Sequence, residues 1–325
     1  MIISRAPLRI SIGGGGTDLP SYYNLNGGFL ISTTIDKYIY ITVGETFNKR
    51  FLLKYSSYEN VKKISNIKHP LFRETFKELK ISLPVNISSH ADIPAGSGLG
   101  SSGCFTVALI KALSEFKGLK LNKKEIAELA SKIEIYNLKE PVGKQDQYSS
   151  AFGGFRSYKF HKSGLVIPKK IKITKQRLLS FKKSLTLFYT GQLRSSYKIL
   201  SNQNKLTKKM DKQMIYNLDC VKEMGYQIKN ILEKGNLDDF GYILKDHWNY
   251  KKKRSSEMSN KKIDSIYSYA LNNGAIGGKI IGAGGGGFLM FWSKEKEQFK
   301  KAMKKRKLKE IDFNFEEEGV KNLKI

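Results

Sequence analysis

The chain has 325 residues, of which 40% are hydrophobic, so it is long enough for two domains that each bury a core. No apolar run approaches the roughly 18 residues of a membrane-spanning helix, and no membrane partner is expected. The formal net charge is +29, but only nine of the 58 basic residues are arginine, and the lysines spread over the whole length. Because arginine binds phosphates and base edges more specifically than lysine does, this distribution argues against a nucleic-acid partner.

Cysteine usage and the N-terminal residues bear on the cellular compartment. Cys104 and Cys220 stand far apart, and the first residues lack the basic and apolar regions of a secretory signal. Both features predict a cytoplasmic protein with free thiols. The four histidines show no metal-ligand spacing, so a transition-metal site is not expected. The oligomeric state is left open.

In chain order, the first half of the sequence is rich in strand patterns. Alternating apolar residues predict a strand over 1–12, which the glycines at 13–16 interrupt. The segments that follow are expected to be two or three strands within 28–57, a helix over 69–79, a strand over 83–93, helices over 102–117 and 123–138, a loop over 139–145, and strands over 153–160 and 184–189.

The second half is dominated by helical periodicity. Residues 195–272 are expected to be nearly all helical, with breaks near 235 and 255–260. The remaining segments are expected to be a strand over 275–281, a glycine loop over 282–287, a strand over 288–292, a helix over 294–306 and a strand over 309–315. Strands first and helices later indicate the α+β class, with two domains assigned to residues 1–190 and 191–325.

A loop rich in glycine and serine joins the strand at 83–93 to the helix that follows it. Its glycines allow close approach of the backbone to a ligand, and the free amide groups of a helix N-terminus attract anions, above all phosphate. The serine hydroxyls add oxygens that can contact a hard cation such as Mg²⁺. The residues expected to bind a nucleotide are Pro94, Gly96, Ser97, Gly98, Leu99, Gly100, Ser101, Ser102 and Gly103.

Other phosphate loops are less consistent with this segment. The Walker pattern is absent. The dinucleotide fingerprint is present as Gly98, Gly100 and Gly103, but a second helix stands where that fold needs a strand ending in an acid. A dinucleotide-dependent oxidoreductase therefore remains an alternative rather than the main interpretation.

Three further clusters accompany the serine loop. The first runs from Ala6-Pro7-Leu8-Arg9 to Thr17-Asp18, the second places Gly143-Lys144-Gln145-Asp146-Gln147 after Glu134, and the third is the glycine-rich stretch 279–287. In this order the clusters resemble those of the GHMP kinase superfamily, which includes galactokinase and the homoserine, mevalonate and phosphomevalonate kinases. The resemblance implies an N-terminal α+β domain with a left-handed β-α-β unit and a C-terminal ferredoxin-like domain.

The resemblance also implies roles for single residues. The serine loop would wrap the phosphates of ATP, with Glu134 and Ser102 as ligands of Mg²⁺, and it is left open whether Ser101 takes the place of Ser102 or joins it. Asp146 would be the general base on the sugar hydroxyl, Arg9 would lie beside it, and Asp18 would hold sugar hydroxyls. A carboxylate beside an arginine stays ionised at neutral pH and can accept a proton. The other residues expected to contact the substrate are Gly14, Gly15, Gly16, Thr17, Lys144, Arg194, Gly284 and Gly285.

Each of these residues also has a simpler interpretation. The glycines at 13–16 could form only a turn, and Glu134 could be a solvated acid on a helix. Asp146 could cap a helix, Lys144 could be one more surface lysine, and the segment that contains Arg194 could be only a helix start.

Within the superfamily, residues 5–20 most resemble the D-glycero-D-manno-heptose 7-phosphate kinases and the kinase region of fucokinases. Galactokinases carry Glu-His where this chain has Gly15-Gly16. The resemblance implies phosphorylation of the anomeric hydroxyl of a heptose 7-phosphate by Mg-ATP, towards a nucleotide-activated heptose for surface polysaccharide. A fucokinase- or galactokinase-like hexose kinase and a non-catalytic sugar sensor stay as alternatives.

Overall fold

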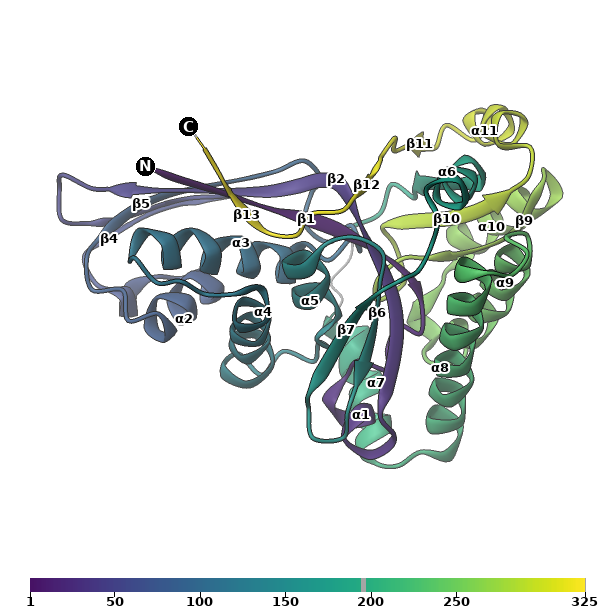
Figure 1. Ribbon diagram of the computed structural model, residues 1–325, viewed down its shortest axis with the longest axis horizontal. Helices are drawn as coiled ribbons and strands as arrows, with labels where there is room; N and C mark the ends of the chain where they lie inside the picture. Colours follow the sequence, from purple (N-terminus) through teal and green to yellow (C-terminus); the bar gives the residue numbers. More distant parts are fainter. Residues whose placement is uncertain (194–196, 325) are drawn as a thin grey trace.

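A computed structural model describes residues 1–193 and 197–324, and the strands in these residues form two sheets (Figure 1). Within the described residues the first sheet has nine strands, and its hydrogen-bonded path runs β13–β1–β2–β5–β3–β4. In addition, β12 and β6 pair with β2, and β7 pairs with β6. These strands are β1 (Ile2–Gly13), β2 (Gly28–Glu45), β3 (Phe51–Lys54), β4 (Tyr58–Val61), β5 (Val85–Ala91), β6 (Arg156–Phe160), β7 (Val166–Lys170), β12 (Phe315–Glu316) and β13 (Lys321–Leu323).

The long strand β2 organises this sheet. It is rich in β-branched and aromatic residues, and it pairs with β1 along most of the length of β1. Its first part pairs with β6 and its last part with β5. The two or three strands expected within 28–57 are thus β2 and the short β3, followed by β4. The strand β5 leads directly towards the serine loop.

The helices α2, α3, α4 and α5 lie on one face of the first sheet (Figure 1). The helix α3 packs on β1 and β2, and both α4 and α5 pack against α3. A capping box between Asn122 and Glu125 fixes the start of α4, and a π-helical turn, Lys132–Asn137, continues it. The helices of this half are α1 (Pro20–Asn26), α2 (Pro70–Glu78), α3 (Ser101–Phe116), α4 (Lys123–Ser131) and α5 (Gln145–Phe152).

The second sheet has four strands among the described residues, in the order β11–β8–β10–β9, and each neighbouring pair is antiparallel. This order, with helices between β8 and β9 and α11 between β10 and β11, is that of the expected ferredoxin-like domain. The elements are α6 (Lys175–Ser184), β8 (Leu185–Tyr189), α7 (Tyr197–Lys208), α8 (Lys212–Glu233), α9 (Asp239–Lys252), α10 (Lys261–Asn272), β9 (Ala275–Ile280), β10 (Phe288–Ser293), α11 (Lys296–Lys305) and β11 (Lys309–Glu310).

Short 3₁₀ turns cover Ile64–Asn66 and Ser256–Met258. The helical stretch expected over 195–272 is confirmed for its described part, with one break that the pattern did not predict. This break separates α7 from α8 at Met210, which has a positive φ of 57°. The α+β class is confirmed, whereas the handedness of the unit that joins the parallel strands β3 and β5 stays a prediction.

The prediction of one strand over 309–315 is wrong. The strand β11 ends at Glu310, and the chain then crosses back to the first sheet, where β12 pairs with β2 and β13 pairs with β1 (Figure 1). The division into residues 1–190 and 191–325 stays a prediction. The sheets do not follow it strictly, because β8 precedes residue 190 and the last strands belong to the first sheet.

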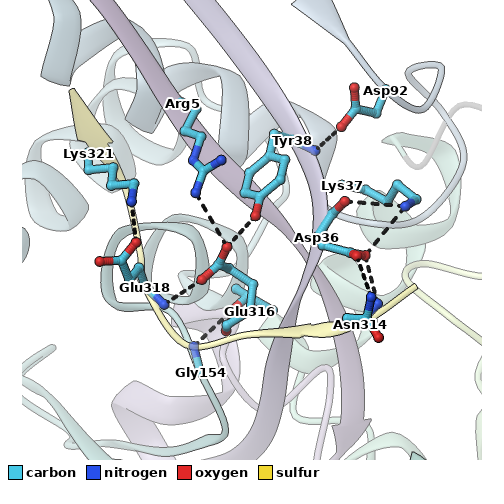
Figure 2. A network of polar contacts seen from close by, with 11 residues as sticks. Arg5, Asp36, Lys37, Tyr38, Asp92, Gly154, Asn314, Glu316, Glu318 and Lys321 are labelled. Atoms are coloured by element: carbon cyan, nitrogen blue, oxygen red, sulfur yellow. Dashed lines mark hydrogen bonds and ion pairs between the residues drawn. The ribbon is translucent and has the colours of Figure 1, made fainter. Parts of the chain in front are cut away.

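Polar contacts hold this C-terminal segment on the first sheet (Figure 2). The backbone N–H and side-chain amide of Asn314 donate to the carboxylate of Asp36 at 2.7 and 3.0 Å. The Tyr38 hydroxyl donates to Glu316, and the Tyr38 N–H donates to Asp92 at 2.8 Å. Because Asp92 directly follows β5, the same network reaches the beginning of the serine loop.

A large apolar cluster links both sheets. At the junction, the Phe181 ring lies 4.9 Å from Phe240, 5.0 Å from Trp292 and 6.2 Å from Phe315 between centroids. Aromatic packing thus joins the two sheets into one body. None of the helices in the described part of the chain is both long and apolar enough to span a bilayer.

Candidate active site

The serine loop folds tightly between β5 and α3. Gly96, Gly98 and Gly100 all have a positive φ, which glycine adopts without steric cost. A Cβ at Gly98 would lie 2.6 Å from the carbonyl oxygen of Ile281, so the loop touches the glycine run that follows β9. The Ser101 hydroxyl, at the first residue of α3, is buried and has no partner among the described residues. A polar ligand could supply that partner.

Glu134 lies in the π-helical turn after α4 and is only 2% exposed, so it is not a solvated acid. Its Oε2 accepts a hydrogen bond from the Ser102 hydroxyl at 2.6 Å, and its Oε1 accepts one from the Gln147 amide at 2.9 Å. Burial raises the pKa of Glu134 to about 7, although both hydrogen bonds oppose the shift. Ser102 and Glu134 thus present two adjacent oxygens at the N-terminus of α3.

Asp146 is paired with Arg9 from β1. The Arg9 Nη2 and Nε lie 2.6 and 2.7 Å from Asp146 Oδ1, and Nη1 donates to the Gly98 carbonyl at 2.6 Å. Asp146 does not cap a helix, because the N-cap of α5 is Lys144. Its side chain stays 28% exposed while that of Arg9 is nearly buried. One carboxylate oxygen is held by the guanidinium, and the carboxylate remains open to the cavity.

Asp18 lies next to this pair. Its carboxylate accepts hydrogen bonds from the backbone N–H groups of Gly16 and Gln145, both at 3.1 Å. Burial, and then the charge of Asp146, raise the pKa of Asp18. A Cβ at Gly143 would overlap the Asp18 carboxylate, so the motif needs glycine there.

These groups line one cavity of about 750 Å³ between the two sheets. It brings together residues that stand far apart in the sequence. The predicted site residues among its lining are Arg9, Gly15, Gly16, Asp18, Pro94, Gly96, Gly98, Gly100, Ser101, Ser102, Glu134, Asp146 and Gly284.

Other predicted site residues have their side chains or backbone engaged elsewhere. The Thr17 hydroxyl bonds the carbonyls of Gly14 and Phe29 at 2.8 and 2.9 Å, which fixes the first turn. The Lys144 ammonium pairs with Glu128 at 2.9 Å and is buried, so Lys144 is neither a surface lysine nor a lining residue. The predicted residues that are not part of the lining are Gly14, Thr17, Ser97, Leu99, Gly103, Lys144 and Gly285. Arg194 lies outside the described residues.

The glycines and Leu99 in that set still support the site, through contacts of their backbone. Gly14 allows the turn to approach the Phe29 backbone, and Gly103 allows α3 to approach Asp146. The Leu99 carbonyl accepts the Arg9 N–H at 3.0 Å, and the Gly285 N–H donates to the Met258 carbonyl at 2.8 Å.

Sequence reasoning missed two groups of lining residues. One is the basic set Lys251, Arg254 and Lys279, which comes from α9, the residues after it, and β9. The other is aromatic: His69 lies 5.3 Å from Phe105 and 4.7 Å from Tyr55 between ring centroids. Lys279 stands in the glycine-rich cluster that the sequence singled out, but nothing nearby marked Arg254 or Lys251.

The described residues contain no group of three or more His, Cys, Asp or Glu side chains that could hold a metal ion. The pair Ser102 and Glu134 nevertheless offers hard oxygen donors. Mg²⁺ is commonly bound by one or two protein oxygens together with substrate phosphates, so these residues fit it.

Comparison with known proteins identifies similar chains. The models described as "GHMP kinases N terminal domain" and "GHMP kinases C terminal" match residues 64–154 and 228–309. The D-glycero-alpha-D-manno-heptose 7-phosphate kinase of Campylobacter jejuni is 31% identical, over 100% of this chain and 99% of that protein.

Two further similarities are informative. The crystal structure of a D-glycero-D-manno-heptose 1-phosphate kinase from Bacteroides thetaiotaomicron matches with a TM-score of 0.83 and 27% identity, covering 100% of this chain and 99% of that one. The bifunctional fucokinase/GDP-fucose pyrophosphorylase of Arabidopsis thaliana is 23% identical over 90% of this chain, which spans 30% of that protein.

Proposed function

This chain belongs to the GHMP kinase family, and from that premise we propose that it transfers the γ-phosphoryl group of ATP to the anomeric hydroxyl of D-glycero-D-manno-heptose 7-phosphate. Family membership and the similarity to heptose phosphate kinases over the full chain make it an ATP-dependent phosphotransferase of the sugar-kinase type. The product would be the 1,7-bisphosphate, an intermediate towards a nucleotide-activated heptose.

The pairing of Arg9 with Asp146 at the serine loop is the observation that carries the proposal. Phosphoryl transfer needs an oriented nucleophile and stabilisation of oxygen charge rather than covalent help from the protein. Asp146 would accept the proton of the anomeric hydroxyl as that oxygen attacks phosphorus. Arg9 holds Oδ1 at 2.6 Å and would stabilise the negative charge that develops on the attacking oxygen. Both side chains line the cavity, so a non-catalytic sugar sensor is the weaker alternative.

The nucleotide would extend from the aromatic group to the serine loop. His69, Phe105 and Tyr55 offer ring faces to a purine base. The first N–H groups of α3, which have no partner within the helix, and the buried Ser101 hydroxyl would bind the phosphates. Ser102 and Glu134 are the residues that would hold Mg²⁺, which neutralises phosphate oxygens when it is bound.

The sugar would lie beside Asp18. Its buried carboxylate, fixed by two backbone N–H groups, can accept hydrogen bonds from sugar hydroxyls. Gly15 and Gly16 leave room next to it for a longer or phosphorylated sugar. The similarity to heptose phosphate kinases over the full chain favours such a substrate over a hexose. A fucokinase-like hexose 1-kinase is the second candidate, on the similarity to the plant enzyme.

A substrate panel tests the proposal. The protein is incubated with Mg-ATP and with heptose 7-phosphates, hexose phosphates, fucose, galactose and free heptose, and ADP release is followed. We expect the highest kcat/KM for D-glycero-D-manno-heptose 7-phosphate. A preference for fucose or galactose over every sugar phosphate would replace this function with that of a hexose kinase.

A further inference from the structure

Arg254, two residues after α9, carries a hydrogen-bond donor that nothing described in the chain satisfies. It lines the cavity and is only 4% exposed. Its Nε donates to the Asn217 side-chain oxygen at 2.9 Å, and its Nη1 donates to the Gly15 carbonyl at 3.0 Å. The Nη2 is buried and has no partner among the described residues. Because a guanidinium stays charged, a buried donor without an acceptor is unfavourable unless a ligand supplies one.

Two buried lysines line the same cavity. The Lys251 ammonium donates to the carbonyls of Ile280, at 2.9 Å, and Gly282, and the Lys279 ammonium donates to the Ile12 carbonyl at 2.9 Å. No ion pair among the described residues involves either lysine or Arg254. Three buried basic side chains are therefore held by neutral groups only, and an anionic ligand would stabilise their charged forms.

The nearby carboxylates do not neutralise this set. Asp146 is already paired with Arg9. Asp18 attracts Arg254 through space, but its oxygens accept hydrogen bonds from the backbone of Gly16 and Gln145 instead. Arg254 is therefore left without an ion-pair partner among the described residues.

Contacts place Arg254 away from the proposed nucleotide site. Arg254 bonds Gly15, next to the Asp18 turn, and Asp18 contacts Gln145, the neighbour of Asp146. Ser102 and Glu134 are hydrogen-bonded to each other at the start of α3, which packs on Asp146 through Gly103. In Figure 1, α9 lies on the right of the molecule while α2, which follows His69, lies on the left. An anion at Arg254 is therefore separated from the triphosphate by the reacting groups.

We propose that Arg254, supported by Lys251 and Lys279, binds a phosphate group of the sugar substrate at the end away from the hydroxyl that is phosphorylated. The planar guanidinium can offer Nη2 to a phosphate oxygen while Nη1 and Nε stay bound to the protein. This assignment rests on the proposed function and makes Arg254 the residue that selects sugar phosphates over free sugars.

The glycines at 13–16 make room for the Arg254 side chain at this position. A Cβ at Gly16 would overlap Nη1 of Arg254, and Gly16 has a φ of 99°, which disfavours other residues. The glycines at 13–16 therefore give space to Arg254 as well as to the proposed sugar. Lys144, expected to contact the substrate, is paired with Glu128 and does not line the cavity.

The test compares Arg254→Gln with wild type. For D-glycero-D-manno-heptose 7-phosphate we expect KM to rise about 10- to 100-fold, as for loss of one charged hydrogen-bond partner. The KM values for ATP and for the free heptose should change by less than about threefold, because neither has a phosphate at Arg254. The KM of Arg254→Lys for the sugar phosphate should lie between those of wild type and Arg254→Gln, since lysine keeps the charge but lacks the planar guanidinium.

Arg177→Gln is the matched control, because Arg177 is a partly buried arginine that donates to carbonyls of Ile231, Leu232 and Gly235 and does not line the cavity. It should retain the wild-type KM values. Inorganic phosphate should inhibit wild type competitively with the sugar phosphate at saturating ATP, a measurement that needs no variant. An unchanged KM in folded Arg254→Gln, or non-competitive inhibition by phosphate, would overturn the assignment.

The two proposals can fail separately. If wild type phosphorylates no sugar phosphate, the proposed function is wrong, and Arg254 is then tested by binding alone. With ADP present to occupy the nucleotide site, inorganic phosphate should raise the unfolding temperature of wild type but not that of Arg254→Gln. An equal rise in both proteins would remove Arg254 as an anion-binding residue.

Discussion

Arg9 Nη2 and Asp146 Oδ1 lie 2.6 Å apart, although 137 positions separate the two residues in the chain. Arg9 comes from β1 and Asp146 from the first turn of α5, so the fold itself brings the pair together. The same guanidinium donates to the Gly98 carbonyl of the serine loop at 2.6 Å. One arginine thus connects the proposed base to the proposed phosphate-binding loop.

Asp146→Asn should lower kcat by roughly 10²- to 10⁴-fold, the usual contribution of a general base. Nucleotide affinity should stay close to that of wild type, because Asp146 is proposed to contact the sugar hydroxyl and not the nucleotide. Stopped-flow turnover and equilibrium binding of ADP measure the two quantities. Asp246→Asn, an exposed carboxylate on α9, is the control. Turnover of Asp146→Asn within about threefold of wild type would exclude Asp146 as the base.

Ser102→Ala and Glu134→Gln should each raise the Mg²⁺ concentration that gives half-maximal activity. Each substitution removes an oxygen from the pair whose atoms lie 2.6 Å apart. We expect a rise of about tenfold or more for Glu134→Gln, which also loses a charge, and less for Ser102→Ala. Ser114→Ala is the control, because this buried serine lies in α3 and its hydroxyl donates to the backbone carbonyl of Lys111. Identical Mg²⁺ titrations in all four proteins would contradict the metal assignment.

Gly15→Glu should raise KM for the sugar phosphate by about tenfold or more while KM for ATP stays unchanged. The carbonyl of Gly15 accepts the Arg254 guanidinium at 3.0 Å, so a carboxylate at this residue would compete with substrate for Arg254 and repel its phosphate. Gly15→Gln adds the same bulk without charge and separates the two effects. If Gln and Glu raise KM equally, size rather than charge is responsible.

Lys279 gives a stability prediction that depends on pH. Burial, and then the charges of Arg254 and Arg9, lower the pKa of Lys279 to about 7. In the unfolded chain the lysine pKa is about 10.4, so between these values the unfolded state binds more protons. The free energy of unfolding of the ligand-free protein should therefore rise from pH 7 to pH 9, by up to roughly 1.4 kcal/mol per pH unit for one proton.

Urea denaturation at pH 7, 8 and 9 measures this slope. Lys279→Met should reduce the slope of the free energy of unfolding against pH, whereas Lys120→Met, at an exposed lysine, should leave that slope unchanged. Two other groups on α9, His247 and Lys251, face Lys279, and burial lowers the pKa of both. Part of the slope should remain because of Lys251, whereas His247, with an unfolded pKa of about 6.5, contributes little above pH 7. A slope in Lys279→Met equal to that of wild type would show that Lys279 keeps its proton in the folded protein.

Local sequence patterns predicted much of the fold because the elements concerned are strongly periodic. The strand, serine loop and helix around residues 83–117 follow from alternation, glycine and helical spacing, and the structure has β5 and α3 there. The strands β12 and β13 were missed, since two or three residues carry little pattern. They form only because the distant C-terminal segment reaches the edge of β1 and the stretch of β2 between its pairings with β6 and β5.

The candidate site likewise contains residues that the sequence predicted and residues that it did not. Glycine and acidic motifs identified the residues around Arg9, Asp18 and Asp146, but Arg254 ends a run of lysines and looks like part of a solvated basic surface. Its burial depends on Asn217 of α8 and on Gly15, both distant in sequence. One signal was available: in a chain with only nine arginines among 58 basic residues, each arginine marks a position that can require a guanidinium.

The position of the transferred phosphate tests the central claim most directly. Wild-type protein is incubated with Mg-ATP and D-glycero-D-manno-heptose 7-phosphate, and the product is examined by phosphorus and proton NMR. The account predicts a second phosphorus signal coupled to the anomeric proton, with the original phosphate retained on C7. A new phosphate on any other carbon, or ADP formation without a phosphorylated product, would contradict it.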